Sequence, residues 1–187
     1  MNDSTERRGR YRRFEDRRVA LMLALHEVLF DQPAGPARDV SLLATLREDF
    51  SVNRAELLLF DGRGEGARPS LGAAVGDDGA TAPARAVDGD GTAALLELHR
   101  QNTGALTLTK FRRPSAFSSE EWSHLWEVEL GDPFTALLSV ELTVSRAPRS
   151  FVWLLLENAS REWGSHDREL AEEAARLLGR AADRAMG

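Results

Sequence analysis

The last third of the chain constrains the fold most, because it predicts two strands, a short turn and then a long helix. The strands are expected at residues 134–144 and 151–157, and the turn between them contains Pro148. Apolar and polar residues alternate along the first strand, so one of its sides is expected to face a core. Over residues 166–185 apolar residues recur at steps of three and four, the period of a helix that packs on one side. Together these elements predict a sheet with a helix packed on it.

The residues before this hairpin predict further helices and strands of a single domain. Residues 1–10 are rich in arginine and are expected to form a disordered arm, which leaves the domain at 11–187. Two prolines and a glycine within residues 32–36 are expected to end a first helix. Ser118 and Glu121 have the spacing of a capping box and predict the start of a short helix. Helices are also expected at 11–30, 39–49 and 92–101, strands at 55–60, 70–75 and 106–110, and a surface loop at 76–91.

The composition excludes several classes of protein. Hydrophobic residues make up 42% of the 187 residues, which is enough to bury one core, and the net charge of −6 argues against a nucleic-acid partner. The chain has no cysteine, which excludes disulfides, thiolate catalysis and iron–sulfur clusters and fits a reducing compartment. No apolar run approaches the roughly 18–20 residues that span a bilayer, and no signal peptide is present. We therefore expect a cytoplasmic protein that does not enter the membrane.

No motif in the chain predicts catalysis or metal binding. A Gly-x-Ser-x-Gly nucleophile motif is absent, and the glycines of residues 62–66 lack the Lys-Ser/Thr of a phosphate-binding loop. The four histidines include no pair at the i, i+4 spacing of a zinc-binding helix. The sequence therefore predicts neither an enzyme nor a metal site nor a bound cofactor.

The order of the expected elements resembles the GAF domain family over about residues 20–185. The most specific part is the ending, where Trp163, Gly164, Asp167 and Leu170 match an aromatic, a small or hydroxyl residue, an acid and a leucine that often follow the last hairpin of these domains. The resemblance implies an α+β fold with a central antiparallel sheet of five or six strands, similar to the profilin-like sheet of PAS domains. Helices would flank the sheet, and the N- and C-terminal helices would pack together.

The family's best-defined chemistries find no counterpart in the sequence. The signature of cyclic-nucleotide GAF domains is absent, and so are the cysteines that attach a chromophore in phytochromes or serve the methionine-sulfoxide-reducing members. What remains is a generic small-ligand or interaction module.

The resemblance also implies a ligand pocket between the sheet and the short helices. Aromatic side chains there would line it, or would pack the helices on the sheet, which is the more common role of large aromatics. His99 and His124 lie on the two short helices that flank such a pocket, and either could be the axial ligand of a haem. The expected pocket residues are Phe111, Arg112, His124, Trp122, Trp126, Phe134 and His99.

The two terminal helices predict a homodimer interface. The first helix has a main apolar stripe and a second apolar edge at Val19, Met22 and His26, which is more apolar surface than one contact needs. The last helix has an alanine-rich stripe that permits close approach. The alternative is a monomer in which both helices cover one face of the sheet. The expected interface residues are Phe14, Leu21, Leu25, Val28, Leu170, Ala174, Leu177 and Ala181.

These observations predict a non-catalytic sensory or regulatory module that acts in signal transduction or in the regulation of transcription. It would bind an unidentified small molecule or regulatory protein partner and would signal through its helical dimer interface. Three alternatives stay open: a haem or other cofactor sensor that uses a pocket histidine, a degenerate GAF domain that serves only protein interaction and dimerisation, and an enzyme with unrecognised acid–base residues. The residues to look at for such an enzyme are Glu127, Glu129, Glu141 and His124.

Overall fold

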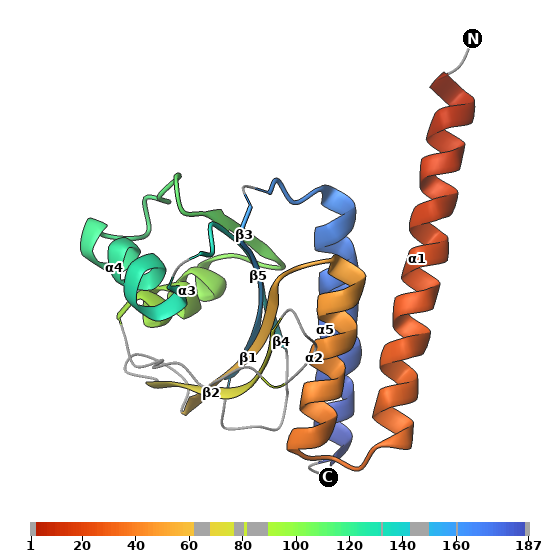
Figure 1. Ribbon diagram of the computed structural model, residues 1–187, viewed down its shortest axis with the longest axis horizontal. Coiled ribbons are helices and arrows are strands. Elements are labelled where there is room, and N and C mark those ends of the chain that lie inside the picture. The colour runs from red at the N-terminus through yellow and green to blue at the C-terminus, as the bar shows by residue number, and fades with distance from the viewer. Residues whose placement is uncertain are drawn as a thin grey trace.

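The computed structural model describes residues 3–61, 68–76, 81, 90–131, 133–142, 150–159 and 161–185. They form a five-stranded antiparallel sheet with helices on both faces (Figure 1). The strands lie in the order β2-β1-β5-β4-β3. They are β1 (Arg54–Asp61), β2 (Arg68–Val75), β3 (Leu106–Thr109), β4 (Ala136–Leu142) and β5 (Ser150–Glu157). The α+β architecture and the antiparallel sheet expected from the sequence are confirmed.

Three long helices lie on one side of the sheet: α1 (Asp3–Asp31), α2 (Pro36–Phe50) and α5 (Ser165–Ala185). Helices α2 and α5 pack on the strands, and α1 lies outside them and packs on both, as Figure 1 shows. Their buried apolar residues form one core cluster with side chains from the sheet, among them Trp153 and Leu155 of β5. The N- and C-terminal helices therefore pack together, as the sequence predicts.

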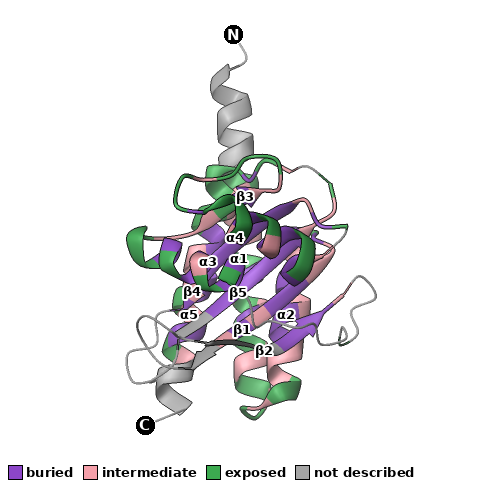
Figure 2. Ribbon diagram, turned by 90° about the vertical axis from the view of Figure 1, so that its left-hand side faces the viewer, coloured by how far each residue is buried: buried purple, intermediate pink, exposed green. Residues whose placement is uncertain are grey.

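The opposite face carries α3 (Asp90–Gln101), α4 (Ser119–Ser123) and a π-helix, η1 (His124–Leu130). A second core cluster lies here and includes Leu154 and Leu156 of β5. Neighbouring residues of β5 thus face different clusters, because side chains alternate along a strand. Residues 152–156 are all buried for this reason, and the strands appear as a buried centre in Figure 2. A strand with both faces covered reads as a continuous apolar run.

Two elements differ from the sequence-based expectation. Helix α1 begins at Asp3, so residues 3–10 are helical where a disordered arm was expected, in a stretch whose Glu and Arg residues favour helix. The capping box of Ser118 and Glu121 is present and starts α4, but the chain then continues as the π-helix η1, which the sequence pattern did not indicate. Most of the expected loop at 76–91 and the turn at 145–149 lie outside the described residues.

No helix in the described part of the chain is both long and apolar enough to cross a membrane.

Candidate functional site

Three of the four aromatic residues expected to line a pocket, Trp122, Trp126 and Phe134, lie buried between the sheet and the helices α3, α4 and η1. Trp122 and Trp126 meet edge to face with ring centroids 5.6 Å apart, and Phe117 contacts Trp122 in the same way at 5.1 Å. The Trp122 indole Nε1 donates to the carbonyl oxygen of Lys110 at 3.1 Å. Phe134 belongs to the same core cluster. These side chains fix α4 and η1 on the sheet, which is the packing role that the sequence left open.

Two polar atoms in this layer are buried without a hydrogen-bond partner among the described residues. They are Oγ1 of Thr92, in the first turn of α3, and the indole Nε1 of Trp126. Buried polar groups in folded proteins nearly always have a partner, which can be an ordered water or a bound molecule. Each of these two atoms therefore has unused hydrogen-bonding capacity.

His99 of α3 is paired with Ser139 of β4 in the same layer. The His99 Nε2 and the Ser139 hydroxyl oxygen lie 2.5 Å apart, and both side chains are buried. Burial lowers the pKa of His99 to about 4, because the protonated ring would lose its hydration. A neutral histidine next to a serine resembles a base and a nucleophile, but Ser139 is fully enclosed and offers no surface to a substrate. Nε2 is also already occupied, so a haem would have to displace Ser139 from it.

Glu129 of η1 is a functional candidate that the sequence indicated only as one of several possible acid–base residues. Its carboxylate is 1% exposed and accepts hydrogen bonds from the backbone N–H groups of Gly91 and Thr92 at 2.8 and 2.9 Å. These N–H groups belong to the first turn of α3, where the helix dipole favours a negative charge. The Nε2 of His124 lies 3.6 Å from Glu129, on a side chain that is 37% exposed. The site is a buried carboxylate that joins η1 to the start of α3.

Glu129 lies within the π-helix η1, and π-helical segments often mark functional sites. An α-helical reading of residues 118–130 also places Glu129 on the face of Trp122, Leu125 and Trp126, because residues three, four and seven positions apart share one face of a helix. The sequence pattern does not show its partners, the backbone N–H groups of Gly91 and Thr92.

Phe111 and Arg112 lie outside this layer. Both belong to the turn after β3, where Phe111 is 75% exposed and Arg112 is also exposed. Arg112 lines a basin beside β3 that it shares with Arg113 and Arg161. The seven expected pocket residues therefore do not line one cavity. Trp122, Trp126, Phe134, His99 and His124 belong to the α3–η1 layer, whereas Phe111 and Arg112 do not.

The main apolar stripe of the terminal helices closes the core of a single chain. Leu21, Leu25, Leu170 and Ala174 are at most 2% exposed and belong to the cluster under α1, α2 and α5. The other four residues of the expected dimer interface are half-buried beside them: Phe14, Val28, Leu177 and Ala181. Four of the eight expected interface residues thus belong to the core of one chain, where α1 packs on α2 and α5. The dimer itself stays a prediction.

Polar contacts hold α1 against α2 and α5. Arg17 donates to Asp49 of α2 at 3.0 Å and to Asp167 of α5 at 3.1 Å. Arg18 holds Glu173 of α5 through two hydrogen bonds of 2.5 and 2.8 Å. These pairs set the position of α1 relative to α5.

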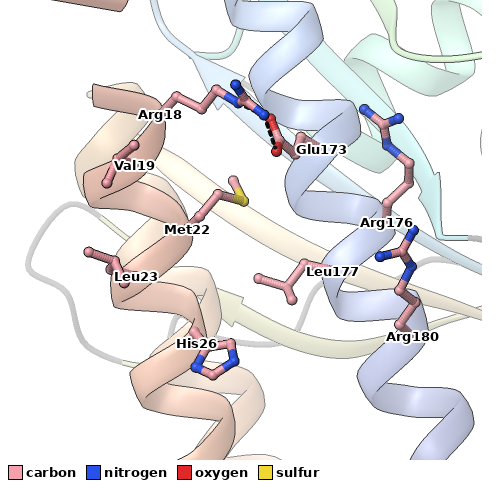
Figure 3. Close-up of a pocket in the computed structure, with 9 residues that line it drawn as sticks. All are labelled: Arg18, Val19, Met22, Leu23, His26, Glu173, Arg176, Leu177 and Arg180. Carbon is pink, nitrogen blue, oxygen red and sulfur yellow. Dashed lines mark hydrogen bonds and ion pairs between the residues drawn. The ribbon is translucent and has the colours of Figure 1, made fainter. Parts of the chain in front are cut away.

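A groove of about 670 Å³ runs between α1 and α5 beyond the Arg18–Glu173 pair (Figure 3). Its apolar lining is Val19, Met22, Leu23 and Leu177, and its rim includes Arg176 and Arg180. Val19, Leu23 and Phe30 of α1 are 55%, 64% and 68% exposed. Val19 and Leu23 line this groove and Phe30 lies beyond its lining, so the exposed apolar residues of α1 are not on the stripe that faces α2 and α5.

The fold matches those of many solved structures. A phycocyanobilin-bound GAF domain from a cyanobacterial phytochrome superposes with a TM-score of 0.67 at 11% identity, over 90% of this chain and 94% of that one. The free methionine-R-sulfoxide reductase from Neisseria meningitidis gives 0.64 at 14% identity over 91% and 93%. The GAF domain of a phosphoenolpyruvate-protein phosphotransferase from Coxiella burnetii gives 0.57 at 10% identity over 90% and 96%. No family model and no curated protein matches the chain. Element order, sheet topology and these superpositions agree that the chain has the GAF-domain fold.

Proposed function

We propose that the protein is a non-catalytic sensory or regulatory module that binds a small molecule or a partner protein and signals through a homodimer formed by α1. A cytoplasmic location and a role in signal transduction or transcription regulation are parts of this proposal. The observation that carries it is the exposed apolar seam of α1, defined as Val19, Leu23, His26 and Phe30.

The seam has the spacing of a helix-pairing surface. Its residues follow one another at steps of four, three and four, which is the pattern of the a and d positions in a coiled coil. Residues 14, 18, 21, 25 and 28 repeat the same steps on the side of α1 that faces the domain. One helix thus carries two seams, and the residues that the structure describes cover only one of them. A second copy of α1 presents the matching surface for the other.

The expected dimer is reversible. Full burial of a Val, Leu or Phe side chain is worth about 1.5–3 kcal/mol, and two copies contribute three such residues each. Association costs roughly 4–15 kcal/mol before any gain appears. The two magnitudes are comparable, so the dimer forms in a concentration-dependent way and can respond to a small change in helix position.

The sheet offers a physical route between a ligand and this interface. Leu154 of β5 packs in the α3–η1 layer, and its neighbour Trp153 packs under α1, α2 and α5. A molecule that forms hydrogen bonds with Thr92 Oγ1 and Trp126 Nε1 would change the packing of the α3–η1 layer on β5. A shift of β5 would then reach the second layer and change how α1 is presented.

One alternative has its own supporting observation. The packing of Trp122 and Trp126 against the sheet supports a domain that serves interaction and dimerisation without a small ligand.

A haem sensor that uses His99 or His124 is tested by an absorption spectrum with added haem. Binding would give a Soret band, and a Phe substitution of the ligand histidine would remove it.

Mass measurement by light scattering tests the dimer. The wild type is expected to approach twice the 20.6 kDa of one chain as the concentration rises. Leu23→Glu places a charge in the seam and is expected to give a monomer at every concentration. Ala20→Glu is the matched control, because Ala20 is an exposed residue of α1 outside the seam. A wild type that stays monomeric at high concentration would rule out the dimer.

A further inference from the structure

A basin of about 620 Å³ lies along the free edge of β3. Three consecutive residues of the strand, Thr107, Leu108 and Thr109, line it. Because successive side chains point to opposite faces of a sheet, a cavity that contacts all three lies at the strand's edge. β3 is the last strand of the sheet and pairs only with β4 within the described sheet. The opposite wall is the link between β5 and α5, which includes Arg161 and Trp163.

The basin is positively charged on a chain whose net charge is −6. Arg112, Arg113 and Arg161 line it, against one acidic lining residue, Glu162. The hydroxyl-bearing residues Thr107, Thr109 and Ser115 also belong to the lining. Guanidinium groups only donate hydrogen bonds, and hydroxyl groups can donate them, so the lining is rich in donors.

Two of the arginines are held in place before any ligand binds. Arg161 lies over the Trp163 ring at 4.1 Å, donates to the Phe50 carbonyl oxygen at 2.7 Å and forms a 3.9 Å ion pair with Glu157 through the same nitrogen. Arg113 donates to the carbonyl oxygen of Phe117. Each contact uses a single nitrogen of a group that has five N–H donors, so most donors stay available. Fixed donors lose little conformational entropy on binding.

Arg112 is the arginine with unused bonding capacity. Its backbone N–H donates to the carbonyl oxygen of Thr109 at 3.0 Å, and this turn brings the residue back beside β3. Its guanidinium forms no hydrogen bond or ion pair with the residues that the structure describes.

We propose that this basin binds a phosphate-bearing small molecule. A phosphate group presents three terminal oxygens, and arginines contact them through paired charge-assisted hydrogen bonds. A carboxylate presents only two oxygens and would leave more of these donors unused. The volume lies within the range of about 300–1,000 Å³ typical of small-molecule sites, so there is room for a group attached to the phosphate. The Trp163 ring is covered by Arg161, so recognition rests on the phosphate and not on stacking.

Calorimetric titration at constant ionic strength tests the site, with inorganic phosphate, ribose 5-phosphate and acetate as probes. The wild type is expected to bind the two phosphates saturably and more tightly than acetate. Arg112→Gln is expected to weaken phosphate binding about tenfold, the effect of losing a charge-assisted contact. Arg12→Gln removes the same charge from an exposed position of α1 and is expected to leave binding unchanged. Trp163 lines the basin, so its fluorescence gives a second readout.

Three results would overturn the proposal. The first is phosphate binding no tighter than acetate binding. The second is equal weakening by Arg12→Gln and Arg112→Gln, which would mean that only net charge matters. The third is binding of a phosphoserine peptide without binding of either small phosphate, which would assign the basin to a protein partner. None of these readouts depends on whether the chain forms a dimer.

Discussion

Replacing Glu129 by Gln is expected to destabilise the fold by about 2–4 kcal/mol. The carboxylate is 1% exposed and accepts two backbone hydrogen bonds, from Gly91 at 2.8 Å and from Thr92 at 2.9 Å. The amide of Gln keeps one acceptor oxygen and turns its NH₂ group toward the other N–H. One charge-assisted bond, worth about 1.5–3 kcal/mol, is lost, and a buried N–H is left without a partner. The remaining bond weakens because its acceptor is neutral, and the favourable interaction with the α3 dipole disappears.

Urea unfolding followed by tryptophan fluorescence measures this loss. Trp122 and Trp126 lie in the same core cluster, so their emission reports the unfolding of the layer that contains Glu129. A loss of 2–4 kcal/mol is a large share of the roughly 5–15 kcal/mol that stabilises a typical domain. It should appear as a lower urea midpoint with an unchanged slope.

Glu127→Gln is the matched control, because Glu127 lies on the same π-helix with an exposed side chain. The same change of charge at a surface position is expected to alter the free energy of unfolding by no more than about 0.5 kcal/mol. If both variants unfold at the same urea concentration, the carboxylate of Glu129 does not anchor α3, and the reasoning fails.

Two further predictions concern the same layer. Because the pKa of His99 is lowered to about 4 in the folded state, the unfolded state binds a proton between pH 6.5 and about 4 that the folded state does not bind. The contribution of neutral His99 to the free energy of unfolding is therefore complete above pH 6.5 and is lost as the pH falls. Between pH 7 and 4.5 the wild type should lose about 2–3 kcal/mol more than His99→Gln, and urea unfolding at both pH values checks it; equal losses contradict it. Gly91→Ala should lower the melting temperature, because a Cβ there would lie 2.6 Å from the backbone nitrogen of Leu125, and an unchanged melting temperature in calorimetry would show that α3 is not held this close to η1.

The elements that the sequence predicted well depend on neighbours along the chain. The alternation of residues 134–144 and the helical period of 166–185 correspond to β4 and α5. The capping box of Ser118 and Glu121 forms as expected, with bonds of 2.7 and 3.1 Å. Period and capping are local properties, so they are readable without knowledge of the fold.

The candidate site depends on pairs that are far apart in the sequence. Ser139 and His99 are 40 residues apart, and Glu129 is 38 residues from Gly91. No local pattern links such residues, because the topology brings them together. The polar side of β4 gave a misleading signal for the same reason: Ser139 looks like a surface residue by alternation, but α3 covers it.

The terminal helices show that the spacing of an apolar stripe does not identify the surface that covers it. The sequence correctly indicated that α1 has more apolar surface than one contact needs. It did not indicate which seam α2 and α5 would cover, and the stronger stripe at Leu21 and Leu25 was expected in a dimer interface. A helix stripe has the same period whether it meets a sheet, a helix of the same chain or a second copy. Only the packed fold shows that the seam of Val19, Leu23, His26 and Phe30 is the one that remains.

The central claim is that α1 pairs with α1 of a second copy. Pulsed electron–electron double resonance, which measures the distance between two spin labels, tests it most directly. The chain has no cysteine, so Glu27→Cys provides one attachment point for a spin label, at an exposed residue of α1 next to the seam. Paired helices lie 8–10 Å apart and rise 1.5 Å per residue, so the two labels are expected within about 35 Å for parallel or antiparallel pairing. Leu23→Glu in the same labelled chain should abolish this distance. A dipolar signal that is absent at high concentration, or that survives Leu23→Glu, would contradict the account.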